Sequence, residues 1–219
     1  MTPKLALLEE YALIARALGA PHRLMLLEQL AQGERGVEAL AVKVQATVAN
    51  ASQHLQLLRR AGLVTSRRQG KAVIYRLTDD KTLLVLDLIR QIGERNLAVV
   101  EQILSGLQGG VDAPQPISRA ELADRIAEGS VTVLDVRPDD EYLMGHIPGA
   151  INVTLDGLET FSSQLSKDDE IVAYCRGPYC IYAHQAVARL RKSGLNARRL
   201  DGGLPEWRAD QRPVETAEI

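Results

Sequence analysis

The sequence has few of the residues that mark a secreted, membrane-bound or metal-binding protein. Its 219 residues include two cysteines and four histidines, and only 4% of them are aromatic. Glu9 and Glu10 interrupt the N-terminal leucines, so this end does not resemble a secretory signal. No apolar run approaches the roughly 20 residues that span a bilayer. We therefore expect a cytoplasmic protein without a membrane partner.

The two cysteines lie close together, and their spacing points to chemistry. Cys175 and Cys180 are separated by four residues. In a reducing compartment such a pair is more often catalytic, redox-active or ligand-binding than a structural disulfide. The remaining composition, with 25% charged and 46% hydrophobic residues, is that of an ordinary globular protein, and the length suits two domains.

The apolar residues of the first half follow helical spacing through most of residues 4–104. A Gly-Ala-Pro break at 19–21 separates the first two helices, and a polar turn at 45–47 separates a short helix, 37–44, from the next one. The predicted inner face of that next helix consists of Val48, Ala51, Leu55 and Leu58. The pattern predicts a helix-turn-helix.

One segment after this helix-turn-helix interrupts the helical spacing. Residues 63–77 predict a β-hairpin with its tip at 67–71, and a long helix over about 79–104 follows. Acidic residues are absent from 59–78, although the whole chain has a formal net charge of −2. The basic residues of this segment are Arg59, Arg60, Arg67, Arg68, Lys71 and Arg76. A basic hairpin directly after a helix-turn-helix favours DNA binding over a merely solvated basic face.

Three segments of this half, 17–27, 51–64 and 70–77, resemble the ArsR-type winged-helix repressors in order and spacing. The resemblance implies a homodimer joined through its first and last helices, which binds a roughly palindromic double-stranded DNA operator. Our candidates for base contacts recur at three-residue spacing and are Thr47, Asn50 and Gln53. Our candidates for phosphate contacts are Ser52, His54, Arg67, Arg68 and Lys71, with helix packing as the alternative role of His54.

The sequence departs from many ArsR-type repressors because it lacks their metal-binding residues. Residues 36–38, before the recognition turn, contain no cysteine. The last helix of the domain has Asp87, Glu94 and Glu101 but no histidine, which is too little for a transition-metal site. We expect no metal and no cofactor, so the inducer must be sensed elsewhere.

A Gly- and Pro-rich stretch at 104–116 marks a linker between two domains. We place a mostly α-helical α+β winged helix-turn-helix domain at 1–105, the linker at 106–116 and a second domain at 117–213. In the second domain, buried strands alternate with helices, which predicts an α/β fold with a central parallel sheet. These strands are expected at 131–136, 150–153, 171–174 and 197–200.

The cysteine loop follows the third of these strands and precedes a helix. Its residues are Cys175, Arg176, Gly177, Pro178, Tyr179 and Cys180. In parallel sheets, ligands bind beyond the carboxyl ends of the strands, where Cys175 falls. The first backbone N–H groups of a helix have no helical partner and carry the positive end of its dipole, so they stabilise a thiolate or a persulfide. The loop is therefore suited to a nucleophilic thiol.

The segments 134–138, 145–153 and 201–207, together with this loop, stand in the order found in rhodanese domains, which residues 117–212 resemble. The resemblance implies that Cys175 takes a sulfane sulfur from a donor as a persulfide and passes it to an acceptor. A loop of six residues is the family's length for holding sulfur. The sixth position is usually Arg or Lys, and here it is Cys180.

Cys180 removes a cation that would help to bind an anionic donor, and it adds a thiol that can form a disulfide or a polysulfide bridge with Cys175. The alternative is that Cys180 is only a small apolar substitute. We assign Cys175, Cys180 and Arg176 as catalytic candidates, with Arg176 partly replacing the missing cation. Structural roles are expected for Asp135, Arg137, His146 and His184.

These observations predict a DNA-binding repressor that senses reactive sulfur or redox state, with a sulfane-sulfur donor or a thiol oxidant as its partner. One alternative is a sulfurtransferase of weak turnover whose DNA-binding half regulates its own expression. Another is a sensor whose two thiolates bind As(III) or another soft metal, although As(III) prefers three sulfur ligands. The sequence does not give the operator, the regulated genes, the physiological donor, or whether modification releases DNA.

Overall fold

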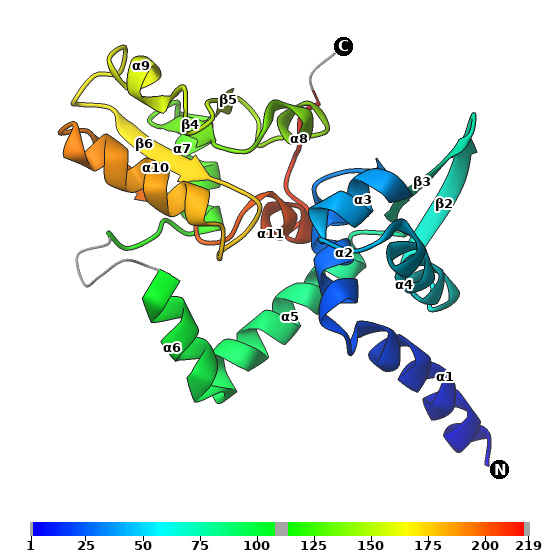
Figure 1. Cartoon of the computed structure of the whole chain (residues 1–219). Coiled ribbons are helices and arrows are strands. Elements are labelled where there is room, and N and C mark those ends of the chain that lie inside the picture. The colour runs from blue at the N-terminus through cyan, green and yellow to red at the C-terminus, as the bar shows by residue number, and fades with distance from the viewer. Residues whose placement is uncertain (1, 108–113, 217–219) are drawn as a thin grey trace. The chain divides into compact units, whose positions relative to one another are not determined.

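Figure 1 shows the computed structural model of the chain, in which residues 2–107 and 114–216 are described. The chain folds as two compact units, Met1–Leu86 and Asp87–Ile219. The middle of the predicted linker, 108–113, lies outside the described residues, and the predicted domain limits at 105 and 117 stay predictions. No helix in the two described ranges is both long enough and apolar enough to cross a membrane.

The first unit is mostly helical, as its apolar spacing predicts. Its helices are α1 (Pro3–Leu18), α2 (Pro21–Ala31), α3 (Val37–Lys43) and α4 (Val48–Arg60). The side chain of Thr47 caps α4, because its hydroxyl accepts a hydrogen bond of 3.2 Å from the backbone N–H of Asn50. Ala51, Leu55 and Leu58 of α4 are fully buried, as expected. The prediction for Val48 is wrong, because its side chain lies in the first turn and is 46% exposed.

A small antiparallel sheet completes the winged helix. It is ordered β1-β3-β2, with β1 at Arg35–Gly36, β2 at Val64–Gln69 and β3 at Ala72–Leu77. The turn of the β2-β3 hairpin contains Gly70, whose φ of 60° is a left-handed conformation that favours glycine. The predicted hairpin is confirmed, whereas the two-residue strand β1 was not expected because it is too short to show a pattern.

The single long helix expected over 79–104 is instead two helices. These are α5 (Lys81–Asn96) and α6 (Ala98–Leu107), with Leu97 between them. The side-chain amide of Asn96 donates to the carbonyl of Ile92 at 2.9 Å, and asparagine side chains that bond to nearby backbone compete with the helical ladder. The boundary between the two units falls inside α5, which therefore belongs to both of them.

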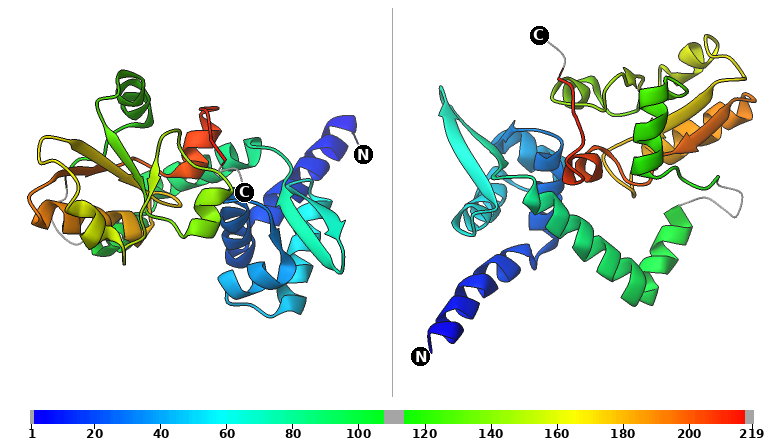
Figure 2. Two further views of the ribbon diagram at one scale, coloured as in Figure 1. Left: turned by 90° about the horizontal axis from the view of Figure 1, so that it is seen from above. Right: turned by 180° about the vertical axis from the view of Figure 1, so that it is seen from behind.

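The second unit contains the predicted parallel sheet, ordered β5-β4-β6-β7. Its strands are β4 (Thr132–Asp135), β5 (Ile151–Asn152), β6 (Glu170–Tyr174) and β7 (Asn196–Arg199). Its helices, besides those named above, are α7 (Arg119–Glu128), α8 (Asp139–Leu143), α9 (Leu158–Ser162), α10 (Ile181–Lys192) and α11 (Leu204–Ala209). Helices cover both faces of the sheet, as the views in Figure 2 show.

Two apolar clusters fill the space on either side of this sheet. On one face, Ala183 and Val187 of α10 and Leu158 of α9 pack against the strands, and Cys175 belongs to the same cluster. On the other face, Leu122 of α7 and Trp207 of α11 form the second cluster. The end of β6 and the start of α10 thus place the cysteine loop at the carboxyl edge of the sheet, on the α10 side.

Candidate functional site

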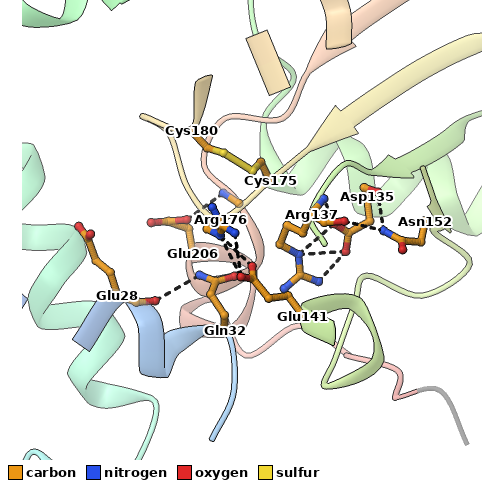
Figure 3. The surroundings of a disulfide bond; sticks show 11 residues. Glu28, Gln32, Asp135, Arg137, Glu141, Asn152, Cys175, Arg176, Cys180 and Glu206 are labelled. Carbon is orange, nitrogen blue, oxygen red and sulfur yellow. Dashed lines mark hydrogen bonds and ion pairs between the residues drawn. A yellow bond between two sulfur atoms is a disulfide. The ribbon is translucent and has the colours of Figure 1, made fainter. Parts of the chain in front are cut away.

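The cysteine loop lies between the end of β6 and the start of α10, as the sequence predicts. Tyr174 is the last residue of β6, Cys175 follows it and is fully buried, and Cys180 is the N-cap residue of α10. The backbone N–H of Cys180 donates to the carbonyl of Gly177 at 3.1 Å, which closes a tight turn inside the loop. Both sulfur atoms are thereby held on the same side of the loop, as Figure 3 shows.

The two cysteines form an intramolecular disulfide. Their Cα atoms are 6.1 Å apart, within the range that disulfides span without backbone movement. Cys175 has no exposed surface, whereas Cys180 is partly buried. Since an attacking thiolate must reach the sulfur, the accessible sulfur of this disulfide is that of Cys180.

The first residues of α11 pack against the backbone of the cysteine loop. The backbone N–H of Leu204 donates to the carbonyl of Cys175 at 3.3 Å. A Cβ at Gly203 would lie 2.5 Å from the backbone nitrogen of Gly177, so only glycine allows this close approach. The carboxylate of Glu206 caps α11 through a 2.8 Å hydrogen bond from the N–H of Gly203, and burial raises the pKa of this carboxyl group.

Arg176, the candidate for partly replacing the missing cation, has a carboxylate partner, and its role toward a donor stays a prediction. Its guanidinium forms a bidentate ion pair with Glu141 of α8, with nitrogen to oxygen distances of 2.8 to 3.1 Å, and Glu141 is fully buried (Figure 3). A buried carboxylate requires a counter-charge, and Arg176 supplies it. The positive charge of Arg176 is therefore balanced by Glu141 in this structure.

Asp135 and Arg137 have the structural role that the sequence predicts. Both are fully buried, and the Nη2 atom of Arg137 donates to Asp135 at 2.5 Å and to the carbonyl of Gly145 at 2.7 Å. The hydroxyl of Tyr174 donates to the Oδ2 atom of Asp135 at 2.6 Å, the same oxygen that accepts from Nη2 of Arg137. This network fixes the loops after β4 and holds the end of β6, which positions the cysteine loop without touching its sulfur atoms.

Two histidines near the carboxyl edge of the sheet also take structural positions. The Nδ1 atom of His146 lies 3.0 Å from the carbonyl oxygen of Tyr142, and its ring stacks on the ring of the same tyrosine. His184 lies in the first turn of α10, where burial and the charge of Arg199 lower its pKa. His184 is therefore neutral at neutral pH and is not a cation for the loop.

Tyr179 of the loop makes a contact that sequence reasoning missed. Its hydroxyl donates to Glu94 of α5 at 2.7 Å, and both residues belong to the second unit. Burial and the hydrogen bond to Glu94 raise the pKa of Tyr179, so the phenol keeps its proton. Arg90 binds the same carboxylate at 2.9 Å and also pairs with Asp87. No sequence pattern indicates this contact, because Tyr179 and Glu94 are 85 positions apart.

The candidates for base contacts all lie on α4. Thr47, Asn50 and Gln53 are exposed in the first unit, which suits a contact with DNA. The hydroxyl of Thr47, however, is engaged in capping α4. Within the part of the chain that the structure describes, no hydrogen bond engages the side chains of Asn50 and Gln53, which lie one helical turn apart, so they are the stronger pair of candidates.

The candidates for phosphate contacts divide into exposed and engaged side chains. Arg68 and Lys71 are exposed on the hairpin, whereas Ser52 is partly buried. Arg67 is also exposed, and its guanidinium pairs with Glu34 and donates to Gln69 at 2.9 Å. Of the candidate cations on the hairpin, Arg68 and Lys71 are therefore the most available for a phosphate contact.

His54 has a different environment from the other candidates. Its ring stacks on that of His22 of α2, with the ring centroids 5.7 Å apart. Burial, followed by the charges of Arg23 and His22, lowers the pKa of His54. A neutral, stacked ring favours the packing role that the sequence left open over a phosphate contact.

Comparisons with known proteins agree with this geometry. The family model for bacterial regulatory proteins of the arsR family matches residues 20–66, and the model for rhodanese-like domains matches residues 118–210. The HTH-type transcriptional regulator Rv0324 of Mycobacterium tuberculosis is 41% identical over 212 residues, which cover 97% of this chain and 93% of that protein.

Two further similarities concern the first half of the chain. The HTH-type transcriptional repressor SmtB of Mycobacterium tuberculosis is 37% identical over 93 residues, which cover 42% of this chain and 69% of that protein. The solution structure of the homodimeric winged helix-turn-helix DNA-binding domain Mb0332 from Mycobacterium bovis is 36% identical. The match covers 44% of this chain and 90% of the Mb0332 chain, with a TM-score of 0.42.

Proposed function

Because the chain belongs to the ArsR family of bacterial transcriptional regulators and carries a rhodanese-like domain, we propose that it is a repressor whose DNA binding responds to reactive sulfur at Cys175 and Cys180. The observation that carries the proposal is the disulfide within the cysteine loop, which joins both cysteines of the protein. A loop that closes on itself stores an oxidised state, whereas a transfer enzyme must release its sulfur. A long-lived state suits a signal.

The chemistry of the loop balances without a further oxidant. The Cys175 thiolate attacks the terminal sulfur of a sulfane-sulfur donor, and the rest of the donor leaves with the electron pair of the broken bond. Cys175 then holds a persulfide. The Cys180 thiolate attacks the Sγ atom of Cys175, the disulfide forms, and hydrosulfide leaves. The two thiols lose two electrons and two protons, and the sulfane sulfur is reduced to hydrosulfide.

The hydrogen bond between Tyr179 and Glu94 supports a connection from this chemistry to DNA binding. Tyr179 directly precedes Cys180, so its position depends on whether the ring of the disulfide is closed. Glu94 lies on α5, a continuous helix that begins in the first unit and ends in the second. In this proposal α5, which contributes residues to both units, is the element through which a local change at the loop biases the DNA-binding unit.

The protein acts as a homodimer in this proposal. Helices α1 and α5 each expose an apolar face, which is unfavourable in water unless a second copy covers it. On α1 the exposed apolar residues include Leu5, Leu8 and Tyr11, and on α5 they include Leu84, Leu88 and Ile92. A dimer joined through α1 and α5 presents two α4 helices, as a palindromic operator requires.

The test is the affinity of the protein for the DNA upstream of its own gene, at a fixed salt concentration. We expect polysulfide treatment of the reduced wild-type protein to change this affinity by about 5- to 150-fold, the usual range of coupling between sites. Cys175→Ser should abolish the change. An unchanged affinity of the wild-type protein, with disulfide formation verified by mass spectrometry, would overturn the proposal.

Cys180→Ser is the matched variant that identifies the signalling state. This variant can form a persulfide on Cys175 but cannot close the disulfide. If it fails to respond to polysulfide, the disulfide is the signal. If it responds as the wild type does, the persulfide is the signal and Cys180 acts only in recovery.

A second candidate function is sulfur transfer, which the match of residues 118–210 to rhodanese-like domains favours. In that case thiosulfate and cyanide would be converted at a steady rate that Cys175→Ser abolishes and Cys180→Ser leaves intact. A dithiol site for As(III) is the third alternative. With only two cysteines in the chain, it needs an external third sulfur, and it predicts binding without added sulfur mass.

A further inference from the structure

Val48 stands apart from the other apolar residues of α4 that the sequence assigns to the core. Ala51, Leu55 and Leu58 have no exposed surface, whereas 46% of the surface of Val48 is exposed. A single exposed valine is ordinary on a protein surface, so exposure by itself indicates nothing. What distinguishes Val48 is its place, because it is the first residue of α4 and directly follows the turn of the helix-turn-helix.

The geometry of a helix N-terminus accounts for this exposure. Every Cα–Cβ bond of an α-helix tilts toward the N-terminal end. The backbone of Thr47, just before Val48, is extended, with a φ of −69° and a ψ of 152°. The side chain of Val48 therefore has no preceding helical turn to cover and projects beyond the end of α4. In helix-turn-helix proteins this end of the second helix lies in the major groove, where its residues contact base edges.

The first residues of α4 offer few hydrogen-bonding groups to a base. The hydroxyl of Thr47 accepts a hydrogen bond of 3.2 Å from the backbone N–H of Asn50 and thus serves the cap. Val48 and Ala49 are exposed, and their side chains end in methyl groups. No acidic residue lies in the first turn. Ahead of Asn50, this end of α4 can therefore recognise a base mainly through apolar contact.

One apolar group distinguishes the bases in the major groove. Thymine carries a 5-methyl group there, beside its O4 acceptor, whereas cytosine has a hydrogen atom in place of the methyl group. Apolar side chains recognise thymine by contact with this methyl group. We infer that Val48 is a specificity-determining residue that contacts the 5-methyl group of a thymine in the operator. The inference requires DNA binding but is independent of the sulfur chemistry at the cysteine loop.

The expected size of the effect follows from the area that the contact removes from water. Burial of one methyl or methylene group corresponds to about a fivefold change in affinity. The loss of either partner, the methyl group of the base or the methyl groups of Val48, should therefore cost about the same. Because the two losses remove the same contact, their effects should not add.

The experiment uses the reduced full-length protein and the double-stranded operator that this protein selects from a random-sequence library. Each thymine of the selected site is replaced in turn by deoxyuridine, which lacks only the 5-methyl group. We expect at least one thymine at which this replacement weakens binding of the wild-type protein about fivefold. Val48→Ala should bind the unmodified operator about fivefold more weakly than the wild type and should not respond to deoxyuridine at that thymine.

Three further variants separate apolar recognition from other effects. Val48→Ile keeps an apolar side chain and should retain the response to deoxyuridine. Asn50→Ala removes a hydrogen-bonding candidate, so it should weaken binding but keep that response. Val42→Ala is the matched control, because Val42 of α3 is a valine with 78% of its surface exposed, and this variant should behave as the wild type.

The outcomes distinguish this inference from the proposed function. An undiminished response of Val48→Ala at every thymine, or no response of the wild-type protein, overturns the role of Val48 and leaves DNA binding intact. An equal loss of response in Val42→Ala also overturns it, because the effect is then not particular to the end of α4. If the library yields no enriched sequence, operator recognition fails, and the proposed repressor falls together with this inference.

Discussion

The basic hairpin and the cysteine loop differ in how their positive side chains are surrounded. On the hairpin, Arg68 and Lys71 are exposed and have solvent around them. At the loop, Arg176 pairs with a fully buried Glu141. An exposed cation is available to a polyanion such as DNA, whereas a cation that balances a buried carboxylate is part of the fold. Charge in the sequence therefore indicates function only where the structure leaves it unpaired.

The largest expected difference between the two regions is in stability. Asp135→Ala removes the partner of the buried Arg137 and should lower the free energy of unfolding of the second unit by about 3–5 kcal/mol. Glu34→Ala removes the exposed partner of Arg67 and should cost less than about 1 kcal/mol.

Urea unfolding followed by the fluorescence of Trp207 measures this contrast, since Trp207 is the only tryptophan and is buried in the second unit. Far-UV circular dichroism follows the helices of both units. Similar costs for the two variants would mean that burial does not separate the two ion pairs.

The next prediction concerns the exposed charges of the hairpin. Arg68→Ala should weaken binding to operator and to unrelated DNA alike, and it should reduce the slope of log affinity against log salt by about one, as for one phosphate contact. Lys192→Ala, at the exposed end of α10, is the control with the same loss of charge. An effect of Lys192→Ala equal to that of Arg68→Ala would reduce the hairpin's role to one of net charge.

A smaller effect is expected at the contact between the loop and α5. Tyr179→Phe removes one hydrogen bond to Glu94, of about 1 kcal/mol, and should reduce the response of DNA affinity to polysulfide about fivefold. Disulfide formation itself should proceed normally. Tyr182→Phe is the control, because Tyr182 is equally exposed and its ring contacts Arg176. An unaltered response of Tyr179→Phe would remove this hydrogen bond from the pathway.

The smallest expected effect is a decrease in the free energy of unfolding in mild acid. In each unit we expect one histidine to cause it. Burial lowers the pKa of His54 in the first unit and of His184 in the second. The unfolded chain then binds more protons, so this stability is present above the ordinary histidine pKa of about 6.5 and is lost as the pH falls below it.

Replacement by glutamine should remove the pH dependence from one unit only. With His184→Gln, the transition followed by Trp207 should become flat between about pH 6.5 and 5.5, while the remaining acid sensitivity comes from His54. Acid sensitivity of the Trp207 transition that persists in this variant would assign it to other groups.

Much of the fold could be predicted from local patterns. The helix-turn-helix, the hairpin and the parallel sheet follow from apolar spacing and from Gly and Pro positions, which act over a few residues. Patterns were insufficient where a distant or competing contact decides the outcome. The predicted last helix is divided after Asn96, whose side chain bonds to the carbonyl of Ile92, and Val48 is exposed although its spacing matches that of Leu55 and Leu58.

The sequence by itself determined which residues carry the chemistry. The two cysteines are separated by four residues between a strand and a helix, and a basic segment without acidic residues, 59–78, comes directly after the helix-turn-helix. The tertiary structure decided which charges are available. Arg176 and Glu141 are 35 positions apart, so their ion pair depends on how α8 packs beside the loop. Arg198 and Arg199 are neighbours in sequence, yet the alternation of a strand directs Arg198 to Glu170 and Arg199 to the opposite face of the sheet.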